Sequence, residues 1–399
     1  MSSSQGTSPS CGGRIGRTLA DSEAWFGEPP HSGPDAPNVV LVLLDDTGFA
    51  QIGCYGSDID TPNIDALAAG GVQFTNFHVT PLCSPTRASL LTGRSQHAVG
   101  MRTLSNFRTG FPNQLGHISN HAATVAEVLR QEVCDNHHIE PPGRPEDGYH
   151  LSEDLIDQLL TMISDSTSVR PDRPFFAYVP FGATHAPHQA PPEYLAKYRG
   201  RFDEGWDVVR ERWFRRQVDE GVIPPDTRLA PRNPGVEAWD DLTDNQRRFA
   251  GRLQEAFAAF LDHTDDQIGR LVEGLRDRDL LDNTVFVVLA DNGASQEGGN
   301  TGVMHEMKYF NFLAEDVDAA VERLDDIGGP HSHTNYPWGW AQCGNTPFRW
   351  YKQNTHEGGV HVPLVIRDPR RITDHGGRRD QFHHVTDIVP TIYDLAGVT

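Results

Sequence analysis

Apolar residues form several short continuous runs along the chain, separated by longer stretches in which they recur every three or four positions. Continuous apolar runs are typical of strands buried on both faces of a parallel sheet. They predict strands at residues 39–44, 72–77, 174–181, 284–290 and 364–366. Helical spacing predicts helices at residues 61–71, 121–132, 151–163, 206–218, 245–279 and 385–398. The order of these elements predicts an α/β fold, in which helices sandwich a doubly wound, mostly parallel sheet.

Polar residues follow the buried strands at their carboxyl ends. Asp45 and Asp46 come after the first strand, and Asp291 and Asn292 after the strand at 284–290. Ligands of open α/β folds bind at the carboxyl ends of the strands, and hard divalent cations such as Ca²⁺ prefer oxygen ligands. These residues are therefore candidate metal ligands. For the first pair, the alternative is a solvated loop that begins with a helix-capping aspartate.

A histidine follows the strand at 174–181. His185 lies just beyond the carboxyl end of that strand, where a histidine can bind substrate or protonate a leaving group. The alternative is a loop histidine that is hydrogen-bonded to the backbone. His188, three residues later, is expected to lie behind it without touching substrate.

The run from Pro81 to Arg94 has the pattern of a loop that leads into a helix. Pro85 suits the first helical turn, and Gly93 suits the end of the helix. Cys83 would then lie at the helix N-terminus, where peptide dipoles lower the pKa of a thiol, and Arg87 adds a positive charge. The run predicts a site that holds an anion beside a reactive side chain. The alternative is a buried structural cysteine before an ordinary helix.

Composition excludes several classes of protein. The chain has 399 residues and a formal net charge of -21, which argues against a general nucleic-acid binder. No apolar window approaches the length of a membrane span, so no membrane partner is expected. Residues 1–37 are rich in Ser, Gly and Pro and lack a signal peptide's apolar core, which predicts a disordered leader. The scattered cysteines contain no CxxC pair, which fits a reducing compartment and predicts a cytoplasmic protein.

Several of these segments together resemble the formylglycine-dependent, arylsulfatase-like sulfatases of the alkaline phosphatase superfamily. The resemblance is carried by Cys83-Ser84-Pro85-Thr86-Arg87, by Asp45-Asp46-Thr47-Gly48, by Asp291-Asn292-Gly293, and by Lys352 followed by Glu357-Gly358-Gly359. It implies that a formylglycine-generating enzyme oxidises Cys83 to an aldehyde, whose hydrate is the nucleophile. It also implies a metal, Ca²⁺ in preference to Mg²⁺. The implied metal ligands are Asp45, Asp46, Asp291, Asn292 and an oxygen of the modified Cys83.

The resemblance implies hydrolysis of a small aryl or alkyl sulfate ester. The metal and Arg87 would hold the sulfate group, and one hydroxyl of the hydrated aldehyde would attack sulfur. His185 or Lys352 would assist the departing alcohol or phenol, and the second hydroxyl would expel sulfate and restore the aldehyde. His361 stands where members of the family often carry arginine, and it is assigned no role.

The chain departs from the family after the helix predicted at 121–132. Sulfatases place a strand there that ends in a Lys-Trp-His motif, and both charged residues of the motif contact the active site. This chain contains no Lys-x-His and no lysine before Lys197. His137 and His138 are either substitutes for the motif or surface loop residues. The chain is therefore interpreted as a catalytic domain at 38–399, with an internal deletion near 132–135 and without the family's smaller C-terminal subdomain.

Three alternatives to an active sulfatase follow from these departures. The first is a phosphoester or phosphonate hydrolase of the same superfamily, because such relatives share the metal site and the Cys-x-Pro-x-Arg run. The second is a truncated, catalytically inactive homologue. The third is an artefact of the gene model, in which case the natural protein carries the missing strand.

Overall fold

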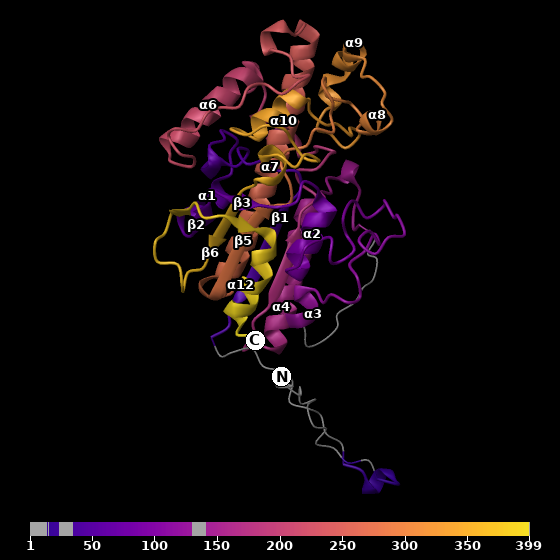
Figure 1. Cartoon of the computed structure of the whole chain (residues 1–399), viewed down its shortest axis with the longest axis vertical. Helices are drawn as coiled ribbons and strands as arrows, with labels where there is room; N and C mark the ends of the chain where they lie inside the picture. The colour runs from indigo at the N-terminus through magenta and orange to yellow at the C-terminus, as the bar shows by residue number, and fades with distance from the viewer. Residues whose placement is uncertain (1–13, 15, 24–34, 130–140, 399) are drawn as a thin grey trace, which may run out of the picture.

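The computed structural model describes residues 14, 16–23, 35–129 and 141–398. It contains a six-stranded sheet in the order β4-β1-β5-β6-β2-β7 and a two-stranded sheet of β3 and β8. The strands are β1 (Asn38–Leu44), β2 (Val72–Phe74), β3 (Phe77–His78), β4 (Phe176–Pro180), β5 (Thr284–Ala290), β6 (Leu364–Arg367), β7 (Gly377–Arg379) and β8 (His383–His384). Figure 1 shows the large sheet running through the middle of the molecule.

The centre of the sheet is the pair of strands with the most continuous apolar runs. Every residue of β1 and β5 is buried, and the two strands pair in parallel over their full lengths. Strand β4 pairs in parallel with the other side of β1, whereas β6 runs antiparallel to both β5 and β2. The prediction of a mostly parallel α/β sheet is confirmed, with the antiparallel strand as an addition.

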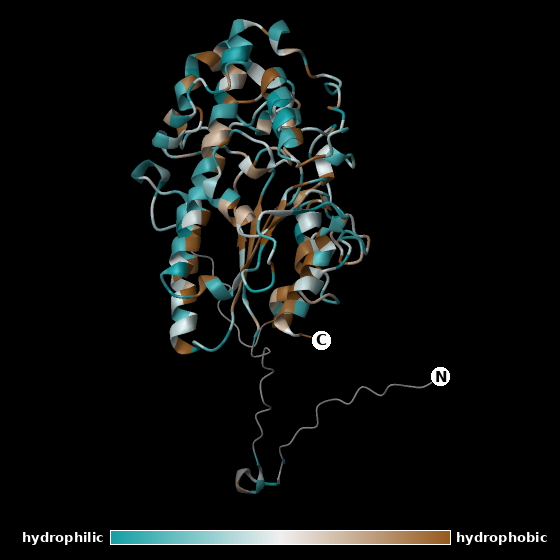
Figure 2. Cartoon of the chain, turned by 90° about the vertical axis from the view of Figure 1, so that its left-hand side faces the viewer, coloured by the Kyte–Doolittle hydropathy of each residue, from teal (hydrophilic) through white to brown (hydrophobic). Residues whose placement is uncertain are grey.

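Helices cover the sheet on both sides, and Figure 2 shows the apolar strands between them. The longest, α7 (Asp244–Arg276), packs against α1 (Pro62–Ala69), α4 (Leu151–Val169) and α5 (Pro192–Lys197). It begins with a capping box, in which Thr243 and Gln246 each accept a hydrogen bond from the other's backbone N–H. A second group consists of α2 (Cys83–Thr92), α3 (Val125–Leu129) and α12 (Ile388–Ala396), in which α3 and α12 contact α2.

Several predicted boundaries are wrong. The strand predicted at 72–77 is two strands, β2 and β3, which belong to different sheets. By contrast, helix α2 begins at Cys83 with Pro85 in its first turn, as predicted, and it ends as predicted at Gly93, which has a left-handed conformation (φ 64°). Helix α4 continues to Val169, six residues beyond the predicted end. The remaining helices are α6 (Gly205–Asp219), α8 (Met307–Phe310), α9 (Val317–Ala320), α10 (Trp338–Gly344) and α11 (Glu357–Val360).

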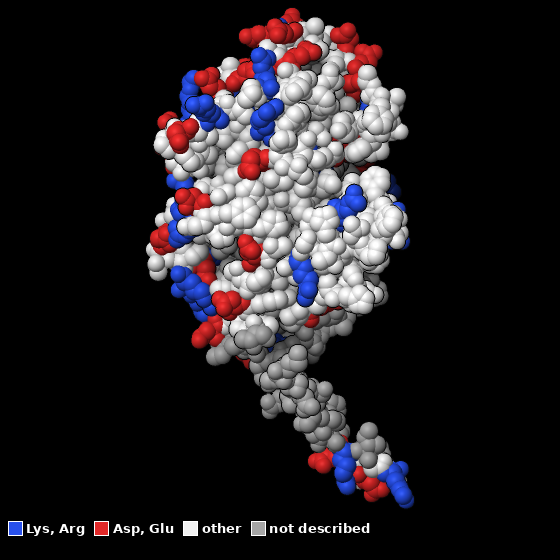
Figure 3. Space-filling model, in the orientation of Figure 1, with Lys and Arg blue, Asp and Glu red and all other residues white. Residues whose placement is uncertain are grey.

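Charged side chains are unevenly distributed over the face shown in Figure 3. Acidic groups gather at the end of the molecule that carries α9, and the middle of this face is largely uncharged. None of the helices in the described ranges combines the length and the apolar character that a membrane crossing requires. Most of the leader predicted at 1–37 lies outside the described residues.

Candidate active site

The carboxyl ends of β1 and β5 bring two pairs of polar residues together at one edge of the sheet. Asp45 and Asp46 follow β1, and Asp291 and Asn292 follow β5. The backbone N–H of Asp46 donates to Oδ1 of Asp291 at 3.3 Å, and Nδ2 of Asn292 donates to Oδ1 of Asp46 at 2.7 Å. Asp46 has a φ of 61°, in the left-handed region that non-glycine residues rarely adopt. Backbone held in this region is concentrated at functional sites.

The N-terminal turns of α2 face these carboxylates. Nη2 of Arg87 donates to Oδ2 of Asp45 at 2.8 Å, and its Nε donates to Oδ2 of Asp291 at 2.9 Å. The planar guanidinium thereby fixes the separation of the two carboxylates. Sγ of Cys83 lies in the same cluster, within 4.8 Å of one oxygen of each aspartate. The structure therefore brings Cys83 and Arg87 to the two strand ends.

The expectation of a lowered thiol pKa is wrong for the unmodified cysteine. Burial raises the pKa of Cys83 to about 12, and the charges of Asp291 and Asp45 contribute to the increase. Full negative charges close to the sulfur outweigh the partial positive charge at a helix end. At neutral pH the thiol stays protonated in this environment, so an unmodified Cys83 is a poor nucleophile.

Lys352 reaches the same cluster from the segment that precedes α11. Its Nζ donates to Oδ2 of Asp46 at 2.9 Å and to Oε2 of Glu297 at 2.8 Å, and none of these three side chains is more than 3% exposed. Burial opposes the ammonium charge, but the two carboxylates more than offset it and hold the pKa of Lys352 well above its usual value. The lysine is therefore a buried, charged partner of two acids.

Two glycines near the strand ends let the backbone of α10 and of α11 approach them closely. A Cβ atom on Gly293 would lie 1.8 Å from the carbonyl oxygen of Gly358, and one on Gly48 would lie 2.4 Å from that of Gly344. Any side chain at either position would displace the facing backbone. Close backbone packing thus explains both Gly48 and Gly293.

His185 approaches the cluster from the loop after β4. Its Nδ1 lies 2.8 Å from the carbonyl oxygen of Ala186, which can only accept, so Nδ1 carries a proton and Nε2 is directed elsewhere. Nε2 lies 3.6 Å from Oδ2 of Asp46 and 3.8 Å from Oε2 of Glu297. The charge of Asp46 raises the pKa of His185 to about 9. With its side chain 30% exposed, the imidazole is accessible to a ligand from solvent.

His188 lies behind the site in the core. It is 1% exposed, and its ring packs against those of Phe257 and Tyr336 at centroid distances of 5.2 and 5.1 Å. Burial lowers its pKa to about 3. The structure thus separates the two histidines of this loop into one at the cluster and one in the core.

The donor set fits the metal that the resemblance implies. Oδ1 of Asp45 and Oδ1 of Asn292 are buried and have no hydrogen-bond partner. Burial raises the pKa of Asp45 and of Asp291, and repulsion from neighbouring carboxylates adds to this effect. Unsatisfied buried oxygens and crowded carboxylates are both costly in a protein interior. A hard divalent cation such as Ca²⁺, which binds six to eight oxygen ligands, would give the unsatisfied oxygens a partner and offset the repulsion between the carboxylates.

Sequence reasoning missed two acidic side chains near the site. Glu297 holds Lys352, and the buried Glu306 accepts a hydrogen bond from Nδ2 of Asn335 at 3.2 Å. Burial raises the pKa of Glu306 to about 7. The only local signal is that two glycines follow Glu297, a pattern too common to identify a functional residue.

His137 and His138, the candidate substitutes for the missing Lys-Trp-His motif, belong to residues 130–140 and so lie outside the described residues. Within the described ranges, Lys352 is the one lysine that reaches the cluster. In the same described ranges, β4 is the edge strand of the six-stranded sheet and pairs with β1.

Comparison with known proteins gives concordant matches. The model of the family described as Sulfatase matches residues 37–398. An uncharacterised sulfatase of Schizosaccharomyces pombe is 31% identical over 436 aligned residues, which cover 91% of this chain and 75% of that protein. This alignment is longer than the 399-residue chain, so the relative carries segments that have no counterpart here.

Two further matches extend the comparison. An arylsulfatase of Klebsiella aerogenes is 26% identical, and the alignment covers 91% of this chain and 87% of the enzyme. The crystal structure of a sulfatase from Pseudoalteromonas sp. superposes with a TM-score of 0.55 at 18% identity, covering 91% of this chain and 68% of that one. At this identity the superposition shows that the fold is shared.

Proposed function

The chain belongs to the sulfatase family of sulfuric ester hydrolases, and we propose that it hydrolyses aryl or alkyl sulfate esters with a nucleophile formed at Cys83. One observation carries the proposal. Cys83 lies at the start of α2, beside a cluster in which buried oxygens of Asp45 and Asn292 have no partner. A reactive side chain beside a cation-binding cluster is the arrangement that transfer of an anionic sulfuryl group requires.

The proposal includes one modification and one metal ion. Formylglycine at Cys83, made by a formylglycine-generating enzyme, would supply a hydrated aldehyde with one hydroxyl to attack sulfur and a second through which sulfate can leave. A Ca²⁺ ion held by Asp45, Asp46, Asp291 and Asn292 would supply positive charge beside the sulfate oxygens.

The other residues of the cluster act by position and charge. Arg87 holds Asp45 and Asp291 in place. His185 is the better placed proton donor to the departing oxygen, because its Nε2 faces the cluster and its side chain is partly exposed. Lys352 is 2% exposed and bonded to two carboxylates, so we assign it to fixing Asp46.

Hydrolysis of a chromogenic aryl sulfate tests the proposal. The chain is co-expressed with a formylglycine-generating enzyme, and its turnover is compared with that of Cys83→Ala and with that of a matched aryl phosphate. Mass spectrometry of the peptide that contains Cys83 reports the aldehyde independently. We expect turnover of the sulfate that requires both the aldehyde and Ca²⁺ and is absent in the variant.

The other outcomes identify the alternatives. If the aldehyde forms at Cys83 but the sulfate is not hydrolysed, the chain is an inactive homologue, and loss of the Lys-Trp-His motif explains the inactivity. Faster turnover of the phosphate would mean a phosphoester hydrolase. Turnover of the sulfate by this chain would show that the motif is dispensable here.

A further inference from the structure

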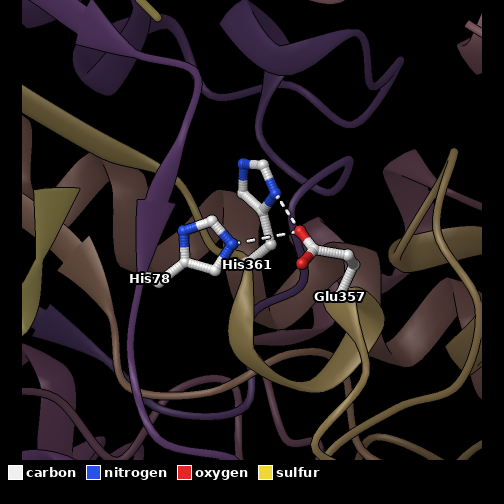
Figure 4. Close-up of side chains that lie close together, drawn as sticks. All are labelled: His78, Glu357 and His361. Carbon is white, nitrogen blue, oxygen red and sulfur yellow. Dashed lines mark hydrogen bonds and ion pairs between the residues drawn. The ribbon is translucent and has the colours of Figure 1, made fainter. Parts of the chain in front are cut away.

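Three metal-binding side chains converge at a point away from the carboxylate cluster (Figure 4). His78 comes from β3, Glu357 is the first residue of α11, and His361 follows the last residue of that helix. Oε2 of Glu357 lies 3.0 Å from Nε2 of His78 and 2.7 Å from Nδ1 of His361. Figure 4 shows both imidazole rings directed at the same carboxylate. The two histidines therefore point one ring nitrogen each at the same oxygen atom, Oε2 of Glu357.

The hydrogen bonds of His361 fix which of its ring nitrogens faces Glu357. Its Nε2 lies 2.8 Å from the carbonyl oxygen of Thr75, which can only accept, so Nε2 carries the proton. Burial lowers the pKa of His361, which favours the neutral ring. Nδ1 of the neutral ring then turns a lone pair toward Oε2 of Glu357, which has no proton to donate when it is ionised. Two electron pairs at 2.7 Å repel each other unless a cation or a proton lies between them.

The surroundings fix both rings in orientation. His361 stacks on Phe348 at a centroid distance of 4.4 Å and meets Phe49 edge-on at 4.8 Å. His78 stacks on Phe382 at 4.9 Å. A backbone carbonyl behind the far nitrogen, as Thr75 provides for His361, is the usual partner of a metal-bound histidine. The ring of His361 is thus arranged as a ligand before any ion binds, whereas Nδ1 of His78 is buried without a partner.

Exposure and spacing suit a small transition-metal ion. The side chains of His78 and His361 are 12% and 7% exposed, whereas that of Glu357 is 53% exposed. The open side leaves room for water as a fourth ligand. Tetrahedral Zn²⁺ with bonds of about 2.0–2.1 Å holds its ligand atoms roughly 3.3 Å apart. The present separations are a few tenths of an ångström shorter, a difference that movement of the exposed Glu357 can make up.

We propose that His78, Glu357 and His361 form a Zn²⁺ site, with water in the fourth position, that is separate from the catalytic centre. Neutral imidazole nitrogen and carboxylate oxygen are zinc ligands, whereas the oxygen-rich cluster at the strand ends suits Ca²⁺. This proposal does not depend on the proposed sulfatase activity.

The site joins two segments that lead to catalytic residues. Strand β3 precedes the turn that ends at Cys83, and its neighbour Val79 donates a backbone hydrogen bond to Val360 at 2.8 Å. On the other side, the carbonyl oxygen of Gly359 accepts from the N–H of Gly293 at 3.1 Å. Zinc bound to His78 and His361 would therefore clamp the start of α2 to the segment that packs behind Asp291 and Asn292. Its role is stabilisation of this region.

Binding of Zn²⁺ to the Cys83→Ala variant in saturating Ca²⁺ tests the proposal. The substitution removes the thiol of the catalytic cluster, and the Ca²⁺ competes with zinc for the oxygen ligands there. Isothermal titration is expected to show one Zn²⁺ ion per chain, and Co²⁺ in its place is expected to give visible absorption bands of a four-coordinate site. In this background His78→Phe, which retains a ring against Phe382, and Glu357→Gln should each weaken binding by more than about tenfold.

His375→Ala is the matched control, since His375 is an exposed histidine that contacts the carbonyl oxygen of Gly70. It should leave zinc affinity unchanged. Circular dichroism of each variant reports whether the fold is retained. Zinc affinity that is unchanged in both His78→Phe and Glu357→Gln would overturn the proposal, as would the absence of stoichiometric binding by the parent variant.

Discussion

Nδ2 of Asn292 donates a hydrogen bond of 2.7 Å to Oδ1 of Asp46 and so ties together the ends of two strands that are 246 residues apart in the sequence. The bond uses the nitrogen of the amide, which leaves the amide oxygen for another partner. In the structure that oxygen is buried and has none. The contact therefore presents an oxygen ligand and holds a carboxylate ligand beside it.

Replacement of Asn292 by alanine is expected to weaken Ca²⁺ binding. A ligand present at 100 times its Kd stabilises the folded state by about 2.7 kcal/mol. Ca²⁺ should thus raise the Tm of the parent protein, and the same concentration should raise the Tm of Asn292→Ala much less. Differential scanning calorimetry with Ca²⁺ and with EDTA measures the effect. Asn245→Ala, at a half-buried asparagine bonded to Asp318, is the control, and an equal Ca²⁺ response in Asn292→Ala would refute the ligand assignment.

Replacement of Arg87 by lysine is expected to reduce both stability and activity. An ammonium group cannot donate to Asp45 and Asp291 in the fixed geometry that the guanidinium provides. Loss of a hydrogen bond to a charged partner costs roughly 1.5–3 kcal/mol. Urea denaturation measures the change, and Arg94→Lys at an exposed position provides the comparison. An Arg87→Lys variant with unchanged stability and kcat would contradict the bridging role.

The parts of this molecule that sequence reasoning predicted are those with strong local signals. Strands β1 and β5 were recognisable because each is a continuous apolar run after its first residue, and Asp46 and Asn292 because they come within two residues of the strand ends. Strands β7 and β8 have three and two residues and no apolar pattern. Their pairing depends on contacts with distant segments, which periodicity cannot reveal.

Contacts with distant segments also define several side chains of the site, and these could not be predicted from the sequence. Glu297 is defined by its bond to Lys352, 55 residues later, and His78 by its contact with Glu357, 279 residues later. The thiol pKa of Cys83 was predicted with the wrong sign because the helix dipole is visible in sequence, whereas the proximity of Asp291 and Asp45 is not.

The buried His188 is expected to make stability depend on pH. Its folded-state pKa of about 3 lies below the unfolded value of about 6.5, so the unfolded state binds more protons between these values. The stabilising contribution is present above pH 6.5 and is lost as pH falls toward 3. At pH 5 the free energy of unfolding is lower by about 2 kcal/mol than it is above pH 6.5.

Replacement of His188 by phenylalanine should flatten this dependence. The ring of Phe still fills the space beside Phe257 and Tyr336, and the substitution removes only the contact of the imidazole with the backbone of Thr184. Urea denaturation between pH 5 and 7.5 gives the slope, with His121→Phe at an exposed position as the matched variant. A slope in His188→Phe as steep as that of the parent would count against a neutral, buried His188.

Substitutions at Lys352 and Glu297 can distinguish an effect on stability from an effect on catalysis. Lys352→Met leaves two buried carboxylates without their cation, and breaking a buried ion pair in this way costs roughly 3–5 kcal/mol. Addition of Glu297→Gln removes one of those charges and should recover part of the stability. It should not recover turnover, because Asp46 still lacks the ammonium that fixes it. Denaturant titration and kcat of both single variants and the double variant measure the two effects. A double variant that regains turnover along with stability would show that Lys352 has no part in positioning Asp46.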